Sequence, residues 1–297
     1  MSTLPPEFLH FLERADRVLG RVESLLPPTP GPVNWEAHAY RWRRRRGYGH
    51  LEAVLHPHQI RTEDLCGVED QLARMDQNTR QFVAGRSANN VLLTGARGTG
   101  KSSLVKAMLD RYGKQGLRLI EVDKDDLVDL PDIVDLVAGR SERYIIFSDD
   151  LSFESGEASY KALKSILDGS IAGTPQNVLI YATSNRRHLM PEFMSENLET
   201  RVENGEIRPG DTTEEKVSLS ERFGLWISFY PFDQDQYLEI CAHWLASFGL
   251  SAEQIAAART DALQWALLRG ARSGRVAWQF ARDYAGRIES ARDGDQA

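Results

Sequence analysis

The chain has 297 residues, 41% of them apolar, and a formal net charge of −7. This is enough apolar material for one large or two modest globular domains, and the charge is too negative for a protein coated in nucleic acid. The two cysteines, Cys66 and Cys241, lie far apart without CxxC spacing, which excludes a disulfide framework or a cysteine zinc site. No run approaches the ~18 apolar residues of a membrane-spanning helix, and no secretory signal pattern occurs. We therefore expect a soluble, cytoplasmic protein with no membrane partner.

The first predicted element is a helix over residues 7–26, because its apolar residues recur three and four apart, as in a helix buried on one face. Four prolines between residues 27 and 32 end it and predict an extended linker. Residues 33–60 are aromatic, basic and irregular, and the pattern assigns no element to them. Within this segment, arginines at 41 and 43–46 surround Trp42.

From Asp64 onward, short apolar runs alternate with helical spacing, a pattern typical of a parallel sheet with crossover helices. The five predicted strands cover residues 91–94, 117–122, 144–148, 178–184 and 225–229. Helices are predicted between them over residues 101–112, 126–138 and 159–169, and after Pro231 over residues 234–248, 251–268 and 273–290. The expected fold is α/β, with a five-stranded parallel sheet between helices and a small helical lid domain after it.

These elements divide the chain into four expected parts. Residues 1–61 hold the first helix, the linker and the basic aromatic segment, and residues 62–231 form the α/β domain. Residues 232–291 form the helical lid, and residues 292–297 form a polar tail.

A glycine-rich loop joins the first predicted strand of the α/β domain to the helix that follows. The string Gly95-Ala-Arg-Gly-Thr-Gly-Lys-Ser102 matches the phosphate-binding pattern G-x4-G-K-[ST] in full. Glycines let successive backbone N–H groups face a phosphate, the lysine reaches its β and γ groups, and the final hydroxyl binds Mg²⁺. We expect ATP to contact Gly95, Ala96, Arg97, Gly98, Thr99, Gly100, Lys101, Ser102 and Ser103.

Two further strands end in polar residues suited to the same site. Tyr144-Ile-Ile-Phe-Ser-Asp-Asp150 has the Walker B pattern, in which Asp149 holds Mg²⁺ together with Ser102, and Asp150 is the general base. An aspartate at the second position is one methylene shorter than the commoner glutamate, so slow turnover is expected unless the geometry of the site compensates. Asn185 follows the strand 178–184 and is expected to position the lytic water or contact the γ-phosphate. The alternative is that one of the next three residues, Arg186, Arg187 and His188, reads phosphate instead.

These elements, with a helical domain after them, resemble the AAA+ ATPases over residues 62 to about 290. The resemblance implies that Arg222, in Leu219-Ser-Glu-Arg-Phe-Gly-Leu225, is an arginine finger that reaches a neighbouring subunit's site. It also implies that Arg275 reads phosphate from the lid, with Arg272 in reserve. The alternative for either arginine is a surface ion pair. By the same resemblance Leu65, Gly67 and Val68 contact adenine, although Asp64 there also suits a helix cap.

Longer strings are similar to one AAA+ family, domain of unknown function 815. They are Asn89-Asn-Val-Leu-Leu, Arg97-Gly-Thr-Gly-Lys-Ser-Ser-Leu-Val-Lys-Ala107, Asp149-Asp-Leu-Ser-Phe-Glu154 and Tyr181-Ala-Thr-Ser-Asn-Arg-Arg-His-Leu189. The resemblance strengthens the fold and leaves the cellular task open.

Together these motifs predict an Mg²⁺-dependent ATPase that assembles as a homo-oligomer through Arg222 and remodels or recruits a protein partner. A nucleotide-gated DNA-binding adaptor is the alternative, in which residues Arg41 to Arg46 pair with phosphates and Trp42 stacks on a base. The same arginines could instead dock onto acidic parts of the protein. A small-molecule kinase fits less well, because the acid pair, Asn185 and the lid favour hydrolysis.

Overall fold

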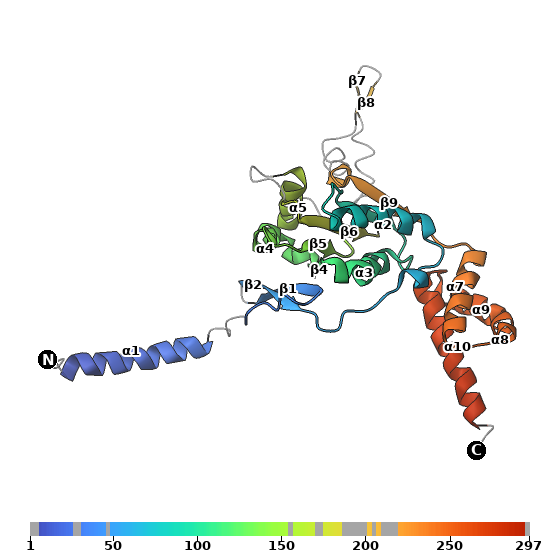
Figure 1. Cartoon of the computed structure of the whole chain (residues 1–297), viewed down its shortest axis with the longest axis horizontal. Coiled ribbons are helices and arrows are strands. Elements are labelled where there is room, and N and C mark those ends of the chain that lie inside the picture. The colour runs from blue at the N-terminus through green and yellow to red at the C-terminus, as the bar shows by residue number, and fades with distance from the viewer. Residues whose placement is uncertain are drawn as a thin grey trace.

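The computed structural model describes residues 6–25, 31–45, 48–153, 157–169, 175–185, 201–203, 206–208 and 219–294. A central sheet lies between two layers of helices, and a separate group of C-terminal helices follows it (Figure 1). Within the described residues, no helix is long and apolar enough to cross a membrane.

The main sheet has seven strands in the order β2-β1-β4-β5-β6-β3-β9. Every neighbouring pair is parallel except β1 and β2, so β2 is an antiparallel edge strand. The strands are β1 (Ala39–Arg45), β2 (Tyr48–Ala53), β3 (Val91–Gly95), β4 (Leu117–Glu121), β5 (Arg143–Ser148), β6 (Val178–Ser184) and β9 (Leu225–Phe229). A separate antiparallel pair is formed by β7 (Arg201–Glu203) and β8 (Glu206–Arg208).

All five predicted strands are confirmed, and the α/β fold with them, but the sheet is two strands wider than predicted. The additional strands β1 and β2 arise from the segment to which the sequence pattern assigned no element. A strand forms here because buried and outward-facing residues alternate along the segment: Tyr40 and Trp42 are buried, while Arg41 and Arg43 point to the other face of β1. Because arginine stands at every second position, β1 lacks the continuous apolar run that identified the other strands, although one of its faces is apolar.

Helices cover both faces of the sheet, so strand residues alternate between two cores. Leu93 and Ile145 pack under α2 (Glu69–Val83) and α3 (Lys101–Tyr112). Leu92 and Ile146 pack in the opposite core. That second core is covered by η3 (Lys124–Asp129), α4 (Leu130–Val137) and α5 (Ala158–Asp168). Strand β6 is buried along its whole length, as expected of a strand covered on both faces.

The C-terminal helices are α7 (Gln234–Ser247), α8 (Ala252–Ala257), α9 (Arg259–Arg269) and α10 (Gly274–Gly294). Asp233 caps α7 and Ser251 caps α8, each in a reciprocal pair with a glutamine three residues on. The helix predicted over residues 251–268 is therefore two helices, α8 and α9, which meet at Ala258. Tyr237 of α7 donates a hydrogen bond to the carbonyl of Ala262, which fixes α7 against α9.

The first helix, α1 (Pro6–Leu25), has the predicted extent but not the predicted burial. Its apolar residues Leu12, Val18 and Leu19 are exposed, and the helix lies apart from the sheet and the C-terminal helices (Figure 1). The periodicity identified an amphipathic helix correctly. It could not show whether the same chain covers the apolar face.

The arginine run of β1 is engaged with acidic side chains of the same chain. Arg41 donates to Glu121 at 2.7 and 3.0 Å, and the Arg43 guanidinium lies 3.3 Å from Glu52. Trp42 is 4% exposed and donates its indole N–H to Asp129 at 3.0 Å. Trp42 is therefore not available to stack on a base, and nucleic-acid binding by this run stays an untested prediction.

Candidate functional site

The glycine-rich loop leaves the end of β3 and enters α3, as its sequence predicts. At Gly95 a Cβ atom would lie 2.0 Å from the carbonyl oxygen of Phe229, so only glycine fits between β3 and β9. Gly98 has a φ of 76°, in the left-handed region that glycine adopts without strain. The loop conformation thus depends on these two glycines, and it aims the N-terminus of α3 at the end of the sheet.

Lys101, the first residue of α3, holds the inside of the loop together. Its amine donates to the carbonyl oxygens of Gly95 and Ala96 at 2.8 and 2.7 Å, and to Oδ1 of Asn185 at 3.0 Å. Burial lowers the pKa of Lys101, while the charges of Asp149 and Asp150 oppose that shift. A desolvated ammonium of this kind is stabilised further by an anion with several oxygen atoms.

Asp149 lies directly opposite Ser102 across the loop. Its Oδ1 accepts hydrogen bonds from the hydroxyls of Ser102 and Thr183, at 2.6 and 2.5 Å. A hydroxyl and a carboxylate at this separation are the oxygen ligands that Mg²⁺ takes beside a nucleotide phosphate. The donor set fits magnesium, and Ser102 and Asp149 are the residues that would hold it. Within the described ranges no cluster of three or more His, Cys, Asp or Glu side chains could hold a metal ion by protein ligands alone.

Asp150 is held in a strained conformation by its neighbours. Its φ is 55°, the only positive value for a non-glycine residue in the part of the chain that the structure describes. Its N–H donates to Thr183 Oγ1 at 2.8 Å, and its carboxylate accepts from Asn185 at 2.5 Å and from Arg97 at 3.2 Å. Left-handed aspartate costs about 1–2 kcal/mol, which these three hydrogen bonds offset.

Thr183 is the residue of this network that the sequence analysis missed. It is 1% exposed and contacts both carboxylate residues, through its hydroxyl to Asp149 and to the backbone of Asp150. In the sequence it stands inside the apolar strand 178–184, where a threonine is an ordinary strand residue. The pairing of β5 with β6 was the one signal that would have placed it beside Asp149.

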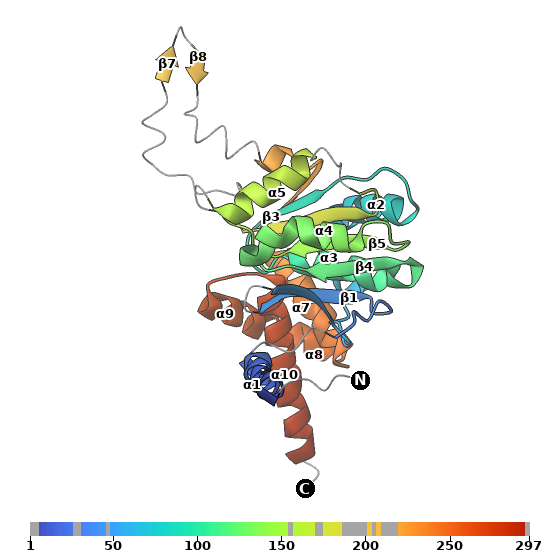
Figure 2. The ribbon, with the colours of Figure 1, turned by 90° about the vertical axis from the view of Figure 1, so that its left-hand side faces the viewer.

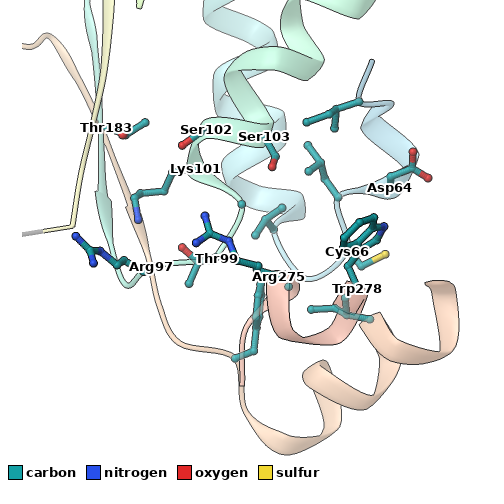
Figure 3. A pocket seen from close by; sticks show the side chains of 18 of the residues that line it. Asp64, Cys66, Arg97, Thr99, Lys101, Ser102, Ser103, Thr183, Arg275 and Trp278 are labelled. Carbon is teal, nitrogen blue, oxygen red and sulfur yellow. The ribbon is translucent and has the colours of Figure 1, made fainter. Parts of the chain in front are cut away.

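A cavity of about 580 Å³ opens from this network toward the C-terminal helices. Figure 3 shows Arg97 and Lys101 at one end and Cys66 and Trp278 at the other, with Thr99 and Arg275 between them. We call the first the phosphate end and the second the base end. The base end is lined by Ile60, Leu65, Cys66, Val68, Phe232, Ile240, Trp244 and Trp278.

Two of the three residues expected to contact adenine line the base end, namely Leu65 and Val68. The third, Gly67, does not line the cavity and packs next to the ring of Phe232. The aromatic residues Trp244 and Trp278 were not predicted. They come from α7 and α10, and no local spacing in the sequence connects them with residues near Leu65.

Of the two lid arginines, Arg275 lines the cavity and Arg272 does not. The lid also contacts the phosphate loop directly, because the N–H of Gly274 donates to the carbonyl of Gly98 at 2.9 Å. A Cβ at Gly98 would approach the Ser273 hydroxyl to 2.8 Å. The start of α10 is thus in van der Waals contact with the loop.

Arg222 lies away from the cavity, just before β9. Its guanidinium forms an ion pair with Asp168 at the end of α5. Its side chain is 24% exposed. A residue that acts on a neighbouring subunit has to lie outside its own subunit's site, so this position leaves the arginine-finger prediction open.

Fold and site together define a class of protein. The chain has a mostly parallel sheet with helices on both faces, a complete phosphate-loop motif at the end of β3, and a helical part after the sheet. This is an AAA+ ATPase-like fold.

The chain belongs to the family described as "Protein of unknown function (DUF815)", whose model matches residues 35–288. Among solved structures, a variant of Thermotoga maritima RuvB is 16% identical with a TM-score of 0.48, over 75% of this chain and 63% of that one. The chain therefore spans less than two thirds of that protein. A Thermotoga maritima RuvB structure titled Holliday junction branch migration motor is 15% identical with a TM-score of 0.41, over 76% and 71%. A chain of the HORMA–CdnC–Trip13 complex of E. coli MS115-1 is 12% identical with a TM-score of 0.45, over 74% and 89%. A comparison with curated proteins finds no match.

Proposed function

We propose that this protein is an AAA+ ATPase that binds ATP with Mg²⁺, hydrolyses it slowly, and uses the nucleotide state to remodel or recruit a protein partner. One observation carries the proposal: a continuous set of hydrogen bonds joins Lys101, Asn185 and Asp150 at the phosphate end of a cavity that also has an aromatic end. Asn185 accepts from the lysine with its oxygen and donates to the aspartate with its nitrogen. The group that binds phosphate is thereby linked to the candidate base.

The nucleotide has a place for each of its parts. Backbone N–H groups of the loop and the Lys101 ammonium face the phosphates, and the base occupies the end with Leu65 and Trp278. Ser102 and Asp149 would hold Mg²⁺, which would neutralise charge on the phosphates. Arg275, from the lid, adds a second cation at the same cavity.

Asp150 is the candidate general base, and the structure suggests how its reactivity is controlled. Its carboxylate is engaged by Arg97 and Asn185, and the Arg97 side chain is 76% exposed. An exposed ion pair contributes at most about 1 kcal/mol, so a phosphate group that attracts Arg97 readily frees one carboxylate oxygen. The freed oxygen then accepts a proton from the attacking water.

The decisive experiment is steady-state ATP hydrolysis over a wide range of protein concentration, with mass measured by light scattering on the same samples. Wild-type activity per subunit should rise as the protein assembles. Lys101→Ala should weaken ATP binding about 10- to 100-fold, because a charged hydrogen-bond donor to phosphate is lost.

Arg222→Ala tests whether neighbouring subunits complete the site. It should bind ATP normally and lose about 10³-fold or more in turnover, as removal of an arginine finger does. The control is Arg86→Ala, which removes an exposed arginine that does not line the cavity. Turnover that is independent of concentration and unaffected by Arg222→Ala would reject the inter-subunit site. Lack of any ATP binding by the wild-type protein would reject the function as a whole.

A further inference from the structure

Helix α1 presents an apolar face to solvent in the single chain. Leu12, Val18 and Leu19 have exposed fractions of 44%, 54% and 60%, and Figure 1 shows the helix apart from the sheet and the C-terminal helices. Large apolar side chains gathered on one face of a helix mark a contact surface. The sequence and the charges of α1 indicate which molecule covers its apolar face.

The apolar residues of α1 follow a seven-residue repeat. With Phe8 as the first position a, positions a and d of α1 are apolar in three successive repeats, and position e is apolar in the two repeats that lie wholly within the helix. Position a is Phe8, Ala15 and Val22, position d is Phe11, Val18 and Leu25, and position e is Leu12 and Leu19. A sustained seven-residue repeat is the pattern of helices that wind around one another. Three apolar positions per repeat make a wider face than the two of a two-stranded coiled coil, so the pattern fits a bundle of more than two helices.

The two flanks of this face carry opposite charges. Position g on one flank is Arg14 in the first repeat and Arg21 in the second, and position b on the other flank is Asp16 in the second repeat and Glu23 in the third. In a ring of parallel helices the g flank of one helix faces the b flank of the next, which places arginine against carboxylate. In an antiparallel pair the g flank of one helix faces the g flank of the other, and b faces b, so like charges meet and destabilise the contact. The charges therefore select parallel copies of the same helix.

The side of α1 opposite the apolar face is polar and satisfied within the helix. His10 lies 3.5 Å from the carboxylate of Glu13, and Arg17 donates to the Glu13 carbonyl at 3.4 Å. Gly20 stands there as well, with no heavy atom within 4 Å of where a Cβ would lie. This side is suited to remain in water while the other is covered.

We propose that the α1 helices of three or more copies of this chain form a parallel bundle that holds the copies together in the absence of nucleotide. The four prolines that follow α1 in sequence suit a semi-rigid spacer between such a bundle and the α/β domain. The inference goes beyond the proposed function, because the bundle needs neither ATP nor Arg222. It would keep neighbouring sites close together while the nucleotide turns over.

The test is the mass of the full chain without nucleotide, measured by sedimentation at several protein concentrations. The wild-type protein should reach at least three times the monomer mass of 33.5 kDa. The Leu19→Glu variant should have a lower mass, close to that of the monomer. Gly20→Glu is the matched control, since it adds the same charge one residue further on at the solvent side and should leave the mass unchanged. ATP binding should be equal in all three proteins, because no residue of α1 lines the cavity; a shortfall there would point to a failure of the nucleotide site and not of the bundle.

Orientation is tested with charges. The double change Arg14→Glu and Arg21→Glu should weaken assembly, and adding Asp16→Arg and Glu23→Arg should restore it, because opposite charges again face each other between parallel copies. A wild-type monomer or dimer, an unchanged mass for Leu19→Glu, or failure of the fourfold variant to recover would each overturn the proposal.

Discussion

The two ends of the cavity are built in different ways. The phosphate end uses residues that are consecutive in sequence or stand at the ends of neighbouring strands, such as Gly98, Lys101 and Asp149. The base end brings together residues as distant as Ile60 and Trp278, from the segment before η1 (Thr62–Asp64) to α10. The first is organised by backbone geometry and charge, and the second by packing between two parts of the fold.

This difference separates the expected effects of substitutions. At the phosphate end the groups are linked by short hydrogen bonds, so one change disturbs several partners and affects chemistry. At the base end each side chain contributes contact area, so one change weakens binding and leaves the chemistry in place.

Of the two ends of the cavity, the larger effect is expected at Thr183, whose hydroxyl supports the Asp149 carboxylate and the Asp150 backbone. Thr183→Val removes the hydroxyl that donates to Asp149 and accepts from the Asp150 N–H. Loss of such a supporting contact costs about 10- to 100-fold in activity. ATP turnover should fall by that factor while the affinity for ATP, measured by calorimetry, changes little. Thr183→Ser keeps the hydroxyl and should keep most of the activity; an equally inactive serine variant would argue against the hydrogen bonds.

At the base end, Trp278→Ala should weaken nucleotide binding without lowering the maximal rate. Trp278 is 38% exposed and lines the cavity opposite the phosphate loop. Aromatic stacking on a base is worth about 1–2 kcal/mol in such a half-open position, or roughly 5- to 30-fold in Kd. Titration with ATP should show this loss, and Trp278→Phe should recover much of it. A lower maximal rate at saturating ATP would instead show that Trp278 affects the hydrolysis step and not only nucleotide binding.

The smallest effect concerns the charge of Lys101 in the nucleotide-free protein. Burial lowers its pKa below 10.5, so between the lowered value and 10.5 the unfolded chain binds more protons than the folded one. The free energy of unfolding therefore increases with pH across this interval. Lys101→Met lacks the titrating amine, so the wild-type protein should gain stability relative to the variant as the pH rises. Urea unfolding from about pH 7 to about pH 10 measures the difference, and a difference that stays constant would contradict the shift.

The residues that the motifs predict for the phosphate end lie together in the structure, because the glycine-rich motif encodes backbone geometry locally. Gly95 and Lys101 act within a few residues of each other, and Asp149 and Asn185 follow strands whose apolar runs are unmistakable. Thr183 was not predicted, because its contacts depend on which strand lies beside β6. Trp244 and Trp278 were not predicted, because only the packing of α7 and α10 against the sheet domain brings them close to Leu65.

The fold shows the same division between local and long-range information. The five predicted strands are apolar over most of their length, whereas β1 was not predicted, because Arg41 and Arg43 occupy the face that pairs with Glu121 and Glu52. Helix α1 was predicted in extent but not in exposure, since periodicity describes a face and not what lies against it.

The contact between Gly98 and Gly274 links the phosphate loop directly to helix α10. Helix α10 has 21 residues, and a helix of that length measures about 30 Å. It runs outward from the cavity, beyond the other C-terminal helices, toward the C-terminus (Figures 1 and 2). Because its first residue is tied to the phosphate loop by a backbone hydrogen bond, a tilt of about 10° at that point would move the far end by about 5 Å. With its pivot at this contact, helix α10 would act as a lever, and a small shift of the phosphate loop would become a displacement the size of a side chain at the far end of the helix.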